Sequence, residues 1–391
     1  MKVKRRHKVV KKLLMPFFNA SMRKQFALQL EKSDLKPPFL VLGNHTTDYD
    51  AFFIAGAFKC PIYFVMSDHV SSIPVAGKLV KFLLSPLPIT KSSIDAGVVR
   101  EIISAVKQGA SVGIFPEGNK SFAGDMSYIK PSIAKLAKKL NIPVVLFNIE
   151  GGYFSQPRWA KNKKRKGRLT ARVGQVISPE EMKEMTNEQL YDRIVSGLRV
   201  NAYEVQEKNP VDYVGKGLAE GIETMLYACP ECGAIGTIRS EGDVFWCSAC
   251  KDACTYTSKG YVVGGHFDRL DKWDEWQKKH IASLNLAHTP NDVPLLHDTG
   301  WEVMEKEDKY NNKQLGNFET FLFSDRLLIA NKETRIELPI ADIVGMGVEG
   351  ACGLQLWIAD GRVYRLKNQA PASALKYADF IWTIQGKPLK F

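Results

Sequence analysis

Between Pro38 and Val205, short apolar runs alternate with longer amphipathic stretches, and this alternation limits the fold more than any other feature of the chain. The apolar runs have the length and composition of buried strands and comprise residues 39–42, 62–66, 111–115 and 143–149. The stretches between them predict helices and comprise residues 50–58, 96–107 and 131–140. Strands that alternate with helices form a largely parallel sheet flanked by helices. We therefore predict an α/β domain, closed near Val205 by helices that begin after the capping residues Ser178 and Thr186.

The rest of the chain has a different pattern and predicts smaller parts. Residues 226–263 are rich in cysteine and glycine and predict a small zinc ribbon, and residues 264–290 predict a linking helix. Residues 315–391 carry short β-type runs and then one helical stretch, which predicts a mainly-β domain closed by a helix. The predicted order is a segment at residues 1–24, the α/β domain at residues 25–210, and then these smaller parts.

Composition excludes several classes of protein. Hydrophobic residues make up 45% of the 391 residues and charged residues 25%, which is ordinary for a globular protein and argues against disordered or fibrous chains. The seven cysteines are odd in number and unevenly spaced, so we expect no secreted disulfide framework.

The net charge of +12 is concentrated in two segments. Residues 1–24 hold nine basic residues and residues 158–168 hold seven, with no acid in either, so the remainder of the chain carries −4. Within the second segment, residues 161–168 predict a solvated loop or a contact with lipid headgroups. A mildly acidic body with two basic segments favours an anionic membrane surface as partner, and we expect no nucleic acid.

A helical stripe in residues 1–24 predicts how the membrane is contacted. Apolar residues recur at helical spacing and basic residues lie off their face: Val10, Leu13, Leu14, Phe17 and Phe18 against Lys8, Lys11 and Lys12. This pattern is typical of a helix lying in a bilayer interface. The alternative is a helix packed on its own domain, and Pro16 argues against one continuous helix. Because no run approaches the roughly 20 apolar residues of a spanning helix, we expect a cytoplasmic protein associated peripherally with the inner face of the cell membrane.

A histidine and an aspartate follow the first predicted strand. His45 and Asp50 are five residues apart, at the turn from the strand into the next helix. Ligands bind at the carboxyl ends of the strands in an open α/β sheet. A histidine there can act as a general base when a carboxylate fixes its tautomer. The same spacing recurs at His266 and Asp271 without that context, and we interpret this second pair as chance.

A second polar block follows another predicted strand. The sequence Phe-Pro-Glu-Gly-Asn-Lys-Ser spans residues 115–121. A loop there can supply Glu117 to accept hydrogen bonds from hydroxyls, and Lys120 and Ser121 to hold a phosphate. The alternative is an ordinary connection between strand and helix.

The two blocks together resemble the PlsC-type glycerolipid acyltransferase family, whose members esterify 1-acyl-sn-glycerol 3-phosphate to phosphatidate. The Asn-His-x-x-x-x-Asp block of that family is matched by Asn44, His45 and Asp50, and its Phe-Pro-Glu-Gly block by residues 115–118. A later Pro-Val strand block is matched by residues 143–145, and the resemblance covers residues 10–205.

The resemblance implies direct transfer of an acyl group, with His45 as general base oriented by Asp50. An acyl thioester, carried by coenzyme A or acyl carrier protein, would be the co-substrate, with no catalytic cofactor. The acceptor would be a lysophospholipid held by residues of the matched blocks: Asn44, Lys91, Glu117, Gly118, Lys120, Ser121 and Lys130. Lysines 91 and 120 stand where the family usually has arginine, and lysine binds phosphate as a point charge rather than bidentately.

Four cysteines in residues 226–263 form two Cys-x-x-Cys pairs. The pairs are Cys229 with Cys232 and Cys247 with Cys250, separated by 14 residues. This spacing predicts a closed structural Zn²⁺ site. The alternatives are free thiols or a redox pair, with Cys254 as a substitute ligand. Residues 229–263 contain three basic and four acidic side chains, which favours a ribbon that contacts protein over one that binds nucleic acid.

Three functional hypotheses follow from the sequence. The first is a peripheral-membrane acyltransferase that makes phosphatidate. The second keeps this chemistry and changes the acceptor to another lysolipid or a polyol phosphate, because lysines replace the arginines. The third is a scaffold that binds nucleic acid or protein through the ribbon. The β domain also weakly resembles PH-like modules.

Overall fold

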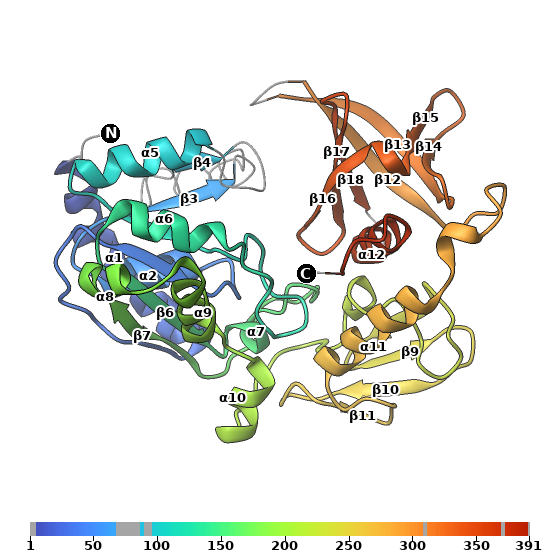
Figure 1. Cartoon of the computed structure of the whole chain (residues 1–391). Helices are drawn as coiled ribbons and strands as arrows, with labels where there is room; N and C mark the ends of the chain where they lie inside the picture. The colour runs from blue at the N-terminus through green and yellow to red at the C-terminus, as the bar shows by residue number, and fades with distance from the viewer. Residues whose placement is uncertain (1–4, 68–86, 90–95, 308–310, 369–371, 390–391) are drawn as a thin grey trace. The chain divides into compact units, whose positions relative to one another are not determined.

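The computed structural model divides into two compact units (Figure 1). The first comprises Met1–Pro157 and Lys163–Val214, and the second comprises Arg158–Asn162 and Gly215–Phe391. The structure describes residues 5–67, 87–89, 96–307, 311–368 and 372–389. In these ranges, no helix combines the length and the apolar character needed to span a bilayer. The finer domain boundaries expected from the sequence stay a prediction.

The first unit is built on a seven-stranded sheet in the order β1-β7-β6-β2-β5-β3-β4. Its strands are β1 (Leu28–Leu30), β2 (Leu40–Gly43), β3 (Ile62–Ser67), β4 (Leu87–Ile89), β5 (Ser111–Ile114), β6 (Val144–Glu150) and β7 (Leu169–Ile177). Neighbouring strands are parallel except β6 and β7, so the predicted α/β fold with a largely parallel sheet is confirmed. The sequence did not indicate β7, because its residues alternate between buried and exposed instead of forming an apolar run.

Helices cover both faces of this sheet, as a parallel sheet requires. Leu40 and Leu42 of β2 pack into one core cluster with α5, α6, α8 and α9, whereas Phe39 and Val41 pack into another with α1 and α2. The helices are α1 (Arg5–Phe26), α2 (Asp50–Ala57), α5 (Ala96–Lys107), α6 (Ser132–Leu140), α7 (Gly152–Ser155), α8 (Pro179–Glu184), α9 (Asn187–Leu198) and α10 (Ala202–Lys208). The predicted starts at Ser178 and Thr186 are confirmed, because both residues form complete capping boxes.

The N-terminal helix α1 continues through Pro16 and packs on the first unit. Lys11, which the sequence placed off the apolar face, is turned inward, and its ammonium group donates to the carbonyls of Phe58 and Cys60 just beyond the end of α2. Burial lowers the pKa of Lys11 to about 8. A lysine in this position stabilises the exposed carbonyls beyond a helix end, so the prediction that Lys11 contacts lipid is wrong.

A second face of α1 is apolar and exposed. Val9, Leu13 and Phe17 recur every four residues and are 50%, 61% and 76% exposed, and Leu14 beside them is 41% exposed. Phe18, which belongs to the predicted stripe, instead packs against Phe52 with ring centroids 4.7 Å apart. The side chains of Val10 and Lys8 lie outside the described residues.

The second unit begins with the cysteine-rich segment, which forms a small antiparallel sheet. The strands are β8 (Ile238–Glu241), β9 (Val244–Cys247), β10 (Ala253–Tyr256) and β11 (Val262–Val263). The predicted helix follows as α11 (Leu270–Ser283). It is fixed to the cysteine-rich segment because buried Trp273 donates its indole N–H to the carbonyl of Ala228 at 2.9 Å.

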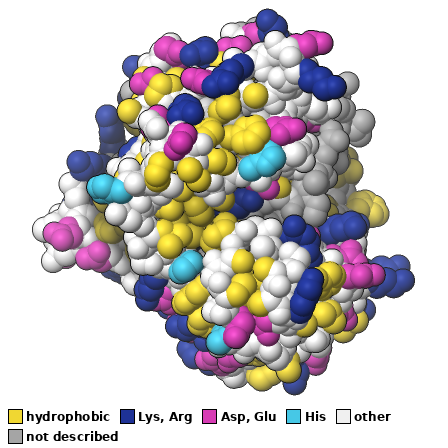
Figure 2. All heavy atoms as spheres, turned by 90° about the vertical axis from the view of Figure 1, so that its right-hand side faces the viewer, with side chains coloured by type: hydrophobic (Ala, Val, Ile, Leu, Met, Phe, Trp, Pro, Cys, Tyr) yellow, Lys and Arg dark blue, Asp and Glu magenta, His cyan; other side chains and the backbone are white. Residues whose placement is uncertain are grey.

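The C-terminal part forms a seven-stranded antiparallel sheet in the order β15-β14-β13-β12-β18-β17-β16. The elements are β12 (Leu296–Lys306), β13 (Asn312–Leu322), β14 (Arg326–Ala330), β15 (Arg335–Pro339), β16 (Ile343–Glu349), β17 (Gly353–Ile358), β18 (Val363–Asn368) and α12 (Ala374–Ile384). This confirms a mainly-β region with a final helix. The sequence did not indicate β12, whose pairing with β13 contains two register shifts. Viewed from the side on which β12–β18 are drawn, basic and acidic side chains are interspersed (Figure 2).

The basic segment at residues 158–168 is not uniformly solvated. Arg158 and Arg165 are 3% and 2% exposed. Arg158 donates to the carbonyl of Gly350 at 2.7 Å and to that of Val348, all within the second unit. The prediction of a solvated loop, which covers residues 161–168, is therefore wrong for the buried Arg165. Arg158 precedes that loop, and backbone carbonyls replace water around its guanidinium group.

Candidate functional site

The two polar blocks meet at the carboxyl ends of neighbouring strands. Leu42 of β2 pairs with Ile114 of β5, so the segments after them emerge side by side. The backbone N–H of Ser121 donates to the carbonyl of His45 at 3.0 Å. Geometry therefore joins the blocks that the sequence separates by about 70 residues, at the sheet edge where ligands bind.

His45 and Asp50 are in direct contact. His45 Nδ1 lies 2.8 Å from Asp50 Oδ2, and Asp50 is fully buried in the first turn of α2. Asp50 also accepts the backbone N–H groups of Thr46 at 2.6 Å and Thr47 at 2.9 Å, and the Thr47 hydroxyl at 2.5 Å. These donors stabilise a buried carboxylate, which otherwise loses the hydration of bulk water.

This contact determines which nitrogen of His45 can act as a base. With the Nδ1 proton donated to Asp50, the lone pair of Nε2 is available for a proton from a substrate. The imidazole stacks on Phe115 with ring centroids 4.4 Å apart, and the His45 side chain remains 24% exposed. The ring is thus held on one face and accessible to a ligand.

The second histidine–aspartate spacing forms no such pair. His266 Nε2 lies 2.5 Å from Glu231, and Asp271 pairs with Arg269. His266 is exposed and Asp271 is largely buried, and the two residues take different partners, as expected of a chance repeat.

Glu117 holds the loop of residues 44–50 through a hydrogen bond to the backbone. Its Oε1 accepts the backbone N–H of His45 at 2.8 Å, and its Oε2 accepts that of Ser127 at 2.7 Å. Burial raises the pKa of Glu117 to about 8, and the negative charges of Asp50 and Asp125 act in the same direction. Because both oxygens are occupied within the protein, we assign Glu117 to positioning His45, rather than to the acceptor contact predicted for it.

Asn44 and Ser121 are also occupied within the protein. Asn44 donates to the carbonyl of Ile149 at 2.9 Å and accepts the N–H of the same residue at 2.7 Å, which attaches the loop to β6. The Ser121 hydroxyl donates to the carbonyl of Asp125 at 2.6 Å and accepts the N–H of Gly124 at 2.9 Å. Both side chains are buried, so their predicted contacts with substrate are replaced by structural ones.

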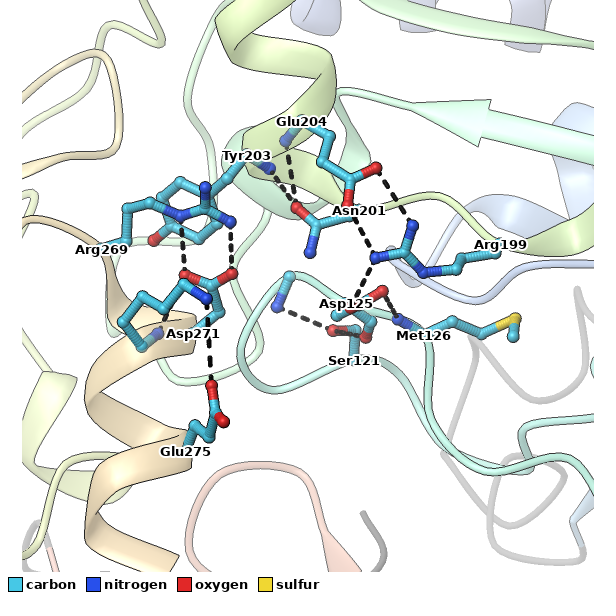
Figure 3. Close-up of polar contacts among 12 residues, drawn as sticks. Ser121, Asp125, Met126, Arg199, Asn201, Tyr203, Glu204, Arg269, Asp271 and Glu275 are labelled. Atoms are coloured by element: carbon cyan, nitrogen blue, oxygen red, sulfur yellow. Dashed lines mark hydrogen bonds and ion pairs between the residues drawn. The ribbon is translucent and has the colours of Figure 1, made fainter. Parts of the chain in front are cut away.

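The loop after Ser121 is braced from the end of α9 (Figure 3). Arg199 contacts Asp125 at 3.2 Å and Glu204 at 2.7 Å. Asn201 caps α10 by accepting the backbone N–H of Glu204 at 3.1 Å. These contacts fix the loop that carries Glu117 and Ser121.

The remaining predicted acceptor residues differ in their placement. Lys120 Nζ lies 2.5 Å from Asp48 Oδ1, inside the His45–Asp50 loop. Gly118 adopts a φ of 75°, which favours glycine, and its N–H donates to the carbonyl of Phe115, so it is not turned toward a substrate. Lys130 is exposed just before α6, and its role stays a prediction. Lys91 lies outside the described residues.

The four cysteines of the ribbon converge on one point. The Sγ atoms of Cys229, Cys232, Cys247 and Cys250 all lie within 4.8 Å of one another, and two of the separations are 3.7 and 3.8 Å. Tetrahedral zinc with Zn–S bonds of about 2.3 Å sets neighbouring sulfurs about 3.8 Å apart, so the cluster fits this metal. The Thr237 hydroxyl lies 3.1 Å from Cys247 Sγ, as an outer contact of a ligand thiolate does.

Three contacts at the site carry no signal in the sequence. Gln156 accepts the backbone N–H of Asp48 at 2.7 Å, although 108 residues separate them. Ser127 reaches Glu117 through its backbone, which any residue type supplies. Asp48 was visible as an acid inside the block, but only the fold shows that it contacts Lys120.

A histidine steadied by a buried carboxylate at the carboxyl edge of a parallel sheet defines an α/β domain suited to general-base chemistry. Residues 25–150 match the protein-family model described as Acyltransferase. Over these residues the chain is therefore similar to acyltransferases.

Three known proteins are similar to parts of this chain. The chain is 28% identical over 118 residues to a 1-acyl-sn-glycerol-3-phosphate acyltransferase of Borreliella burgdorferi, covering 29% of this chain and 47% of that protein. It is also 28% identical over 128 residues to the enzyme of that name from Pseudomonas aeruginosa, covering 32% of this chain and 49% of that protein. The chain thus spans about half the length of these relatives. A crystal structure of the 1-acyl-sn-glycerophosphate acyltransferase PlsC from Thermotoga maritima aligns with a TM-score of 0.42 and 22% identity, covering 52% of this chain and 82% of that one.

Proposed function

We propose that this protein transfers a fatty acyl group from an acyl thioester to the free hydroxyl of a lysophospholipid. The observation that carries the proposal is the contact between His45 Nδ1 and the fully buried Asp50 carboxylate, which leaves Nε2 as an accessible base. The acceptor is 1-acyl-sn-glycerol 3-phosphate, which gives phosphatidate, and the donor is acyl-coenzyme A or acyl carrier protein.

The chemistry needs a base and later an acid, and His45 can be both. Nε2 takes the proton of the acceptor hydroxyl while that oxygen attacks the thioester carbonyl. The imidazolium that forms is stabilised by Asp50. As the tetrahedral intermediate collapses, the C–S bond breaks and the thiolate recovers the proton from His45. No covalent acyl-enzyme is required.

The exposed face of α1 supplies the membrane contact of this proposal. Val9, Leu13 and Phe17 lie on one side of the helix, and the exposed Lys12 and Lys24 add positive charge. Apolar side chains that enter the interface together with basic residues bind anionic bilayers. The opposite face packs on the domain, so α1 would hold the site at the surface where the acceptor resides.

Zinc in the ribbon is the structural part of the proposal. Cys229, Cys232, Cys247 and Cys250 would bind one Zn²⁺ as thiolates in a closed tetrahedral site. The metal would stabilise the ribbon, and no step of acyl transfer involves it.

The test is His45→Ala, compared with His266→Ala as a matched control. Purified proteins are incubated with acyl-coenzyme A and a panel of lysophospholipids, and products are measured by mass spectrometry. Loss of a general base typically costs about 10²–10⁴ in rate, so the His45 variant should lose that much with its melting temperature unchanged. His266, in an exposed pair, should keep wild-type activity. Full activity of the His45 variant would overturn the proposal.

A further inference from the structure

The ion pair between Asp48 and Lys120 lies within the candidate site and is unequally exposed. Asp48 Oδ1 lies 2.5 Å from Lys120 Nζ, and their side chains are 53% and 12% exposed, respectively. Asp48 is three residues after His45, and Lys120 is three residues after Glu117. The cation that the sequence assigned to a phosphate is therefore covered by a carboxylate of the same chain.

The backbone at Asp48 is anchored independently of its side chain. Its N–H donates at 2.7 Å to Oε1 of Gln156, which is 4% exposed. The neighbouring Thr47 is bound by Asp50. The loop itself therefore fixes the Asp48 carboxylate in front of Lys120.

The charges around Asp48 are cationic on balance. Burial acts to raise the pKa of Asp48, but the charge and hydrogen bond of Lys120, with the charges of Lys163 and His45, outweigh it and lower the pKa. Lys163 belongs to the basic segment and is half-buried. Lys120 contacts this carboxylate and Lys163 acts on it through its charge, so the surroundings of Asp48 suit an anionic ligand and disfavour an ammonium headgroup.

We infer that Asp48 is a specificity-determining residue, which holds Lys120 in the acceptor-free site and gives it up to the phosphate of the acceptor. A phosphate carries about −1.5 to −2 charges at pH 7 and offers three acceptor oxygens. It can therefore replace the Asp48 carboxylate on Lys120. An acceptor without phosphate cannot displace the Asp48 carboxylate, so the ion pair between Asp48 and Lys120 stays intact. This inference rests on the proposed acyl transfer and extends it to the class of acceptor.

The first experiment compares Asp48→Asn with wild type on two acceptors, 1-acyl-sn-glycerol 3-phosphate and 1-monoacylglycerol. Removing the competing carboxylate should lower KM for the phosphate-bearing acceptor by about threefold to tenfold, since partly exposed pairs contribute about 1 kcal/mol. The kcat should stay within about twofold, and KM for monoacylglycerol should not change. Asp34→Asn is the matched control, because Asp34 pairs with Lys59 at 2.8 Å with both side chains about 80% exposed.

A second experiment measures binding without turnover. Glycerol 3-phosphate is titrated calorimetrically into His45→Ala and into His45→Ala with Asp48→Asn, and the double variant should bind about threefold to tenfold more tightly. Unchanged or weaker binding of glycerol 3-phosphate by the double variant, or a raised KM of Asp48→Asn for the phosphate-bearing acceptor, would overturn the inference. So would a KM of the wild type that is lower for an ethanolamine-bearing lysolipid than for 1-acyl-sn-glycerol 3-phosphate, because Asp48 would then contact a cation. If wild type transfers acyl groups to no acceptor, the proposed function fails, while the binding result still tests Asp48.

Discussion

The carboxyl group of Glu117 accepts the backbone N–H of His45 at 2.8 Å and ties the loop after β2 to the loop after β5. Because burial shifts the pKa of the Glu117 carboxyl group, its protonation is linked to folding. Burial raises its pKa to about 8 from an ordinary value of 4.5, so the folded protein holds a proton that the unfolded chain releases between these pH values.

The stability of the first unit should therefore fall as pH rises from about 5 to 8. Glu117 alone lowers the free energy of unfolding by at most about 1.4 kcal/mol per pH unit in this range, and has no further effect above its folded pKa. In the variant Glu117→Gln the side chain does not titrate, and one backbone N–H faces the amide NH₂ group. The variant should therefore have a lower free energy of unfolding than wild type at pH 5. This difference in free energy should narrow toward pH 8, because only the wild type loses stability as pH rises. Urea unfolding at several pH values measures this. A pH-independent difference would mean that Glu117 is ionised in the folded protein.

Asp50→Asn should reduce kcat by about 10³-fold or more with little change in KM. Asparagine can present its NH₂ group to Nδ1 and hold His45 in the wrong tautomer, a change that costs about 10⁴ in a comparable histidine–aspartate pair. Steady-state kinetics with a saturating acyl donor measures the loss. Asp192→Asn on the exposed surface of α9 serves as control and should match wild type. A loss confined to KM would instead place Asp50 in acceptor binding.

Leu13→Gln combined with Phe17→Gln should release the protein from anionic vesicles. Burying each side chain in the interface contributes about 1.5–3 kcal/mol, so the double variant should partition at least tenfold less. Both positions are more than half exposed, so the melting temperature should stay unchanged. Co-sedimentation with vesicles measures binding, with Val293→Gln of the second unit as control. Equal sedimentation of all three proteins would assign membrane contact to another surface.

Removing the metal should unfold the ribbon and spare the first unit. Structural zinc contributes folding free energy directly, so chelation should remove one equivalent of zinc and abolish the thermal transition of the second unit. Cys232→Ser should purify without zinc. Cys254→Ser should retain it, because Cys254 is buried in β10 outside the four-sulfur cluster. Retention of a full equivalent in Cys232→Ser would refute the four-cysteine assignment.

The contact between His45 and Asp50 could be predicted from sequence because both residues lie on one short segment between a strand and a helix. Local spacing determines the contact between these two residues. Local spacing likewise brings together the two cysteines of each Cys-x-x-Cys pair. Glu117 could be identified as important, but its role could not, since its partners are backbone groups of His45 and Ser127. Backbone donors leave no trace in residue identity.

Burial of charged residues was the least predictable feature. Lysine is normally exposed, yet Lys11 is partly buried because its ammonium group contacts carbonyls beyond the end of α2. Arg158 likewise depends on carbonyls almost 200 residues away in sequence. A helical pattern gives the angle of each side chain around its axis, but which of two apolar faces meets the core depends on the rest of the fold.

Residues 158–162 belong to the second unit although the first unit surrounds them in sequence. Trp159 is 1% exposed and packs edge-on against Tyr256, and Lys161 donates its backbone N–H to the carbonyl of Glu220 at 2.9 Å. A gene truncated after Val214 would therefore express the first unit with Trp159 exposed to solvent, because Tyr256 would be missing. Such a fragment should aggregate on expression, so we expect the two units to fold correctly only when they are expressed as one chain.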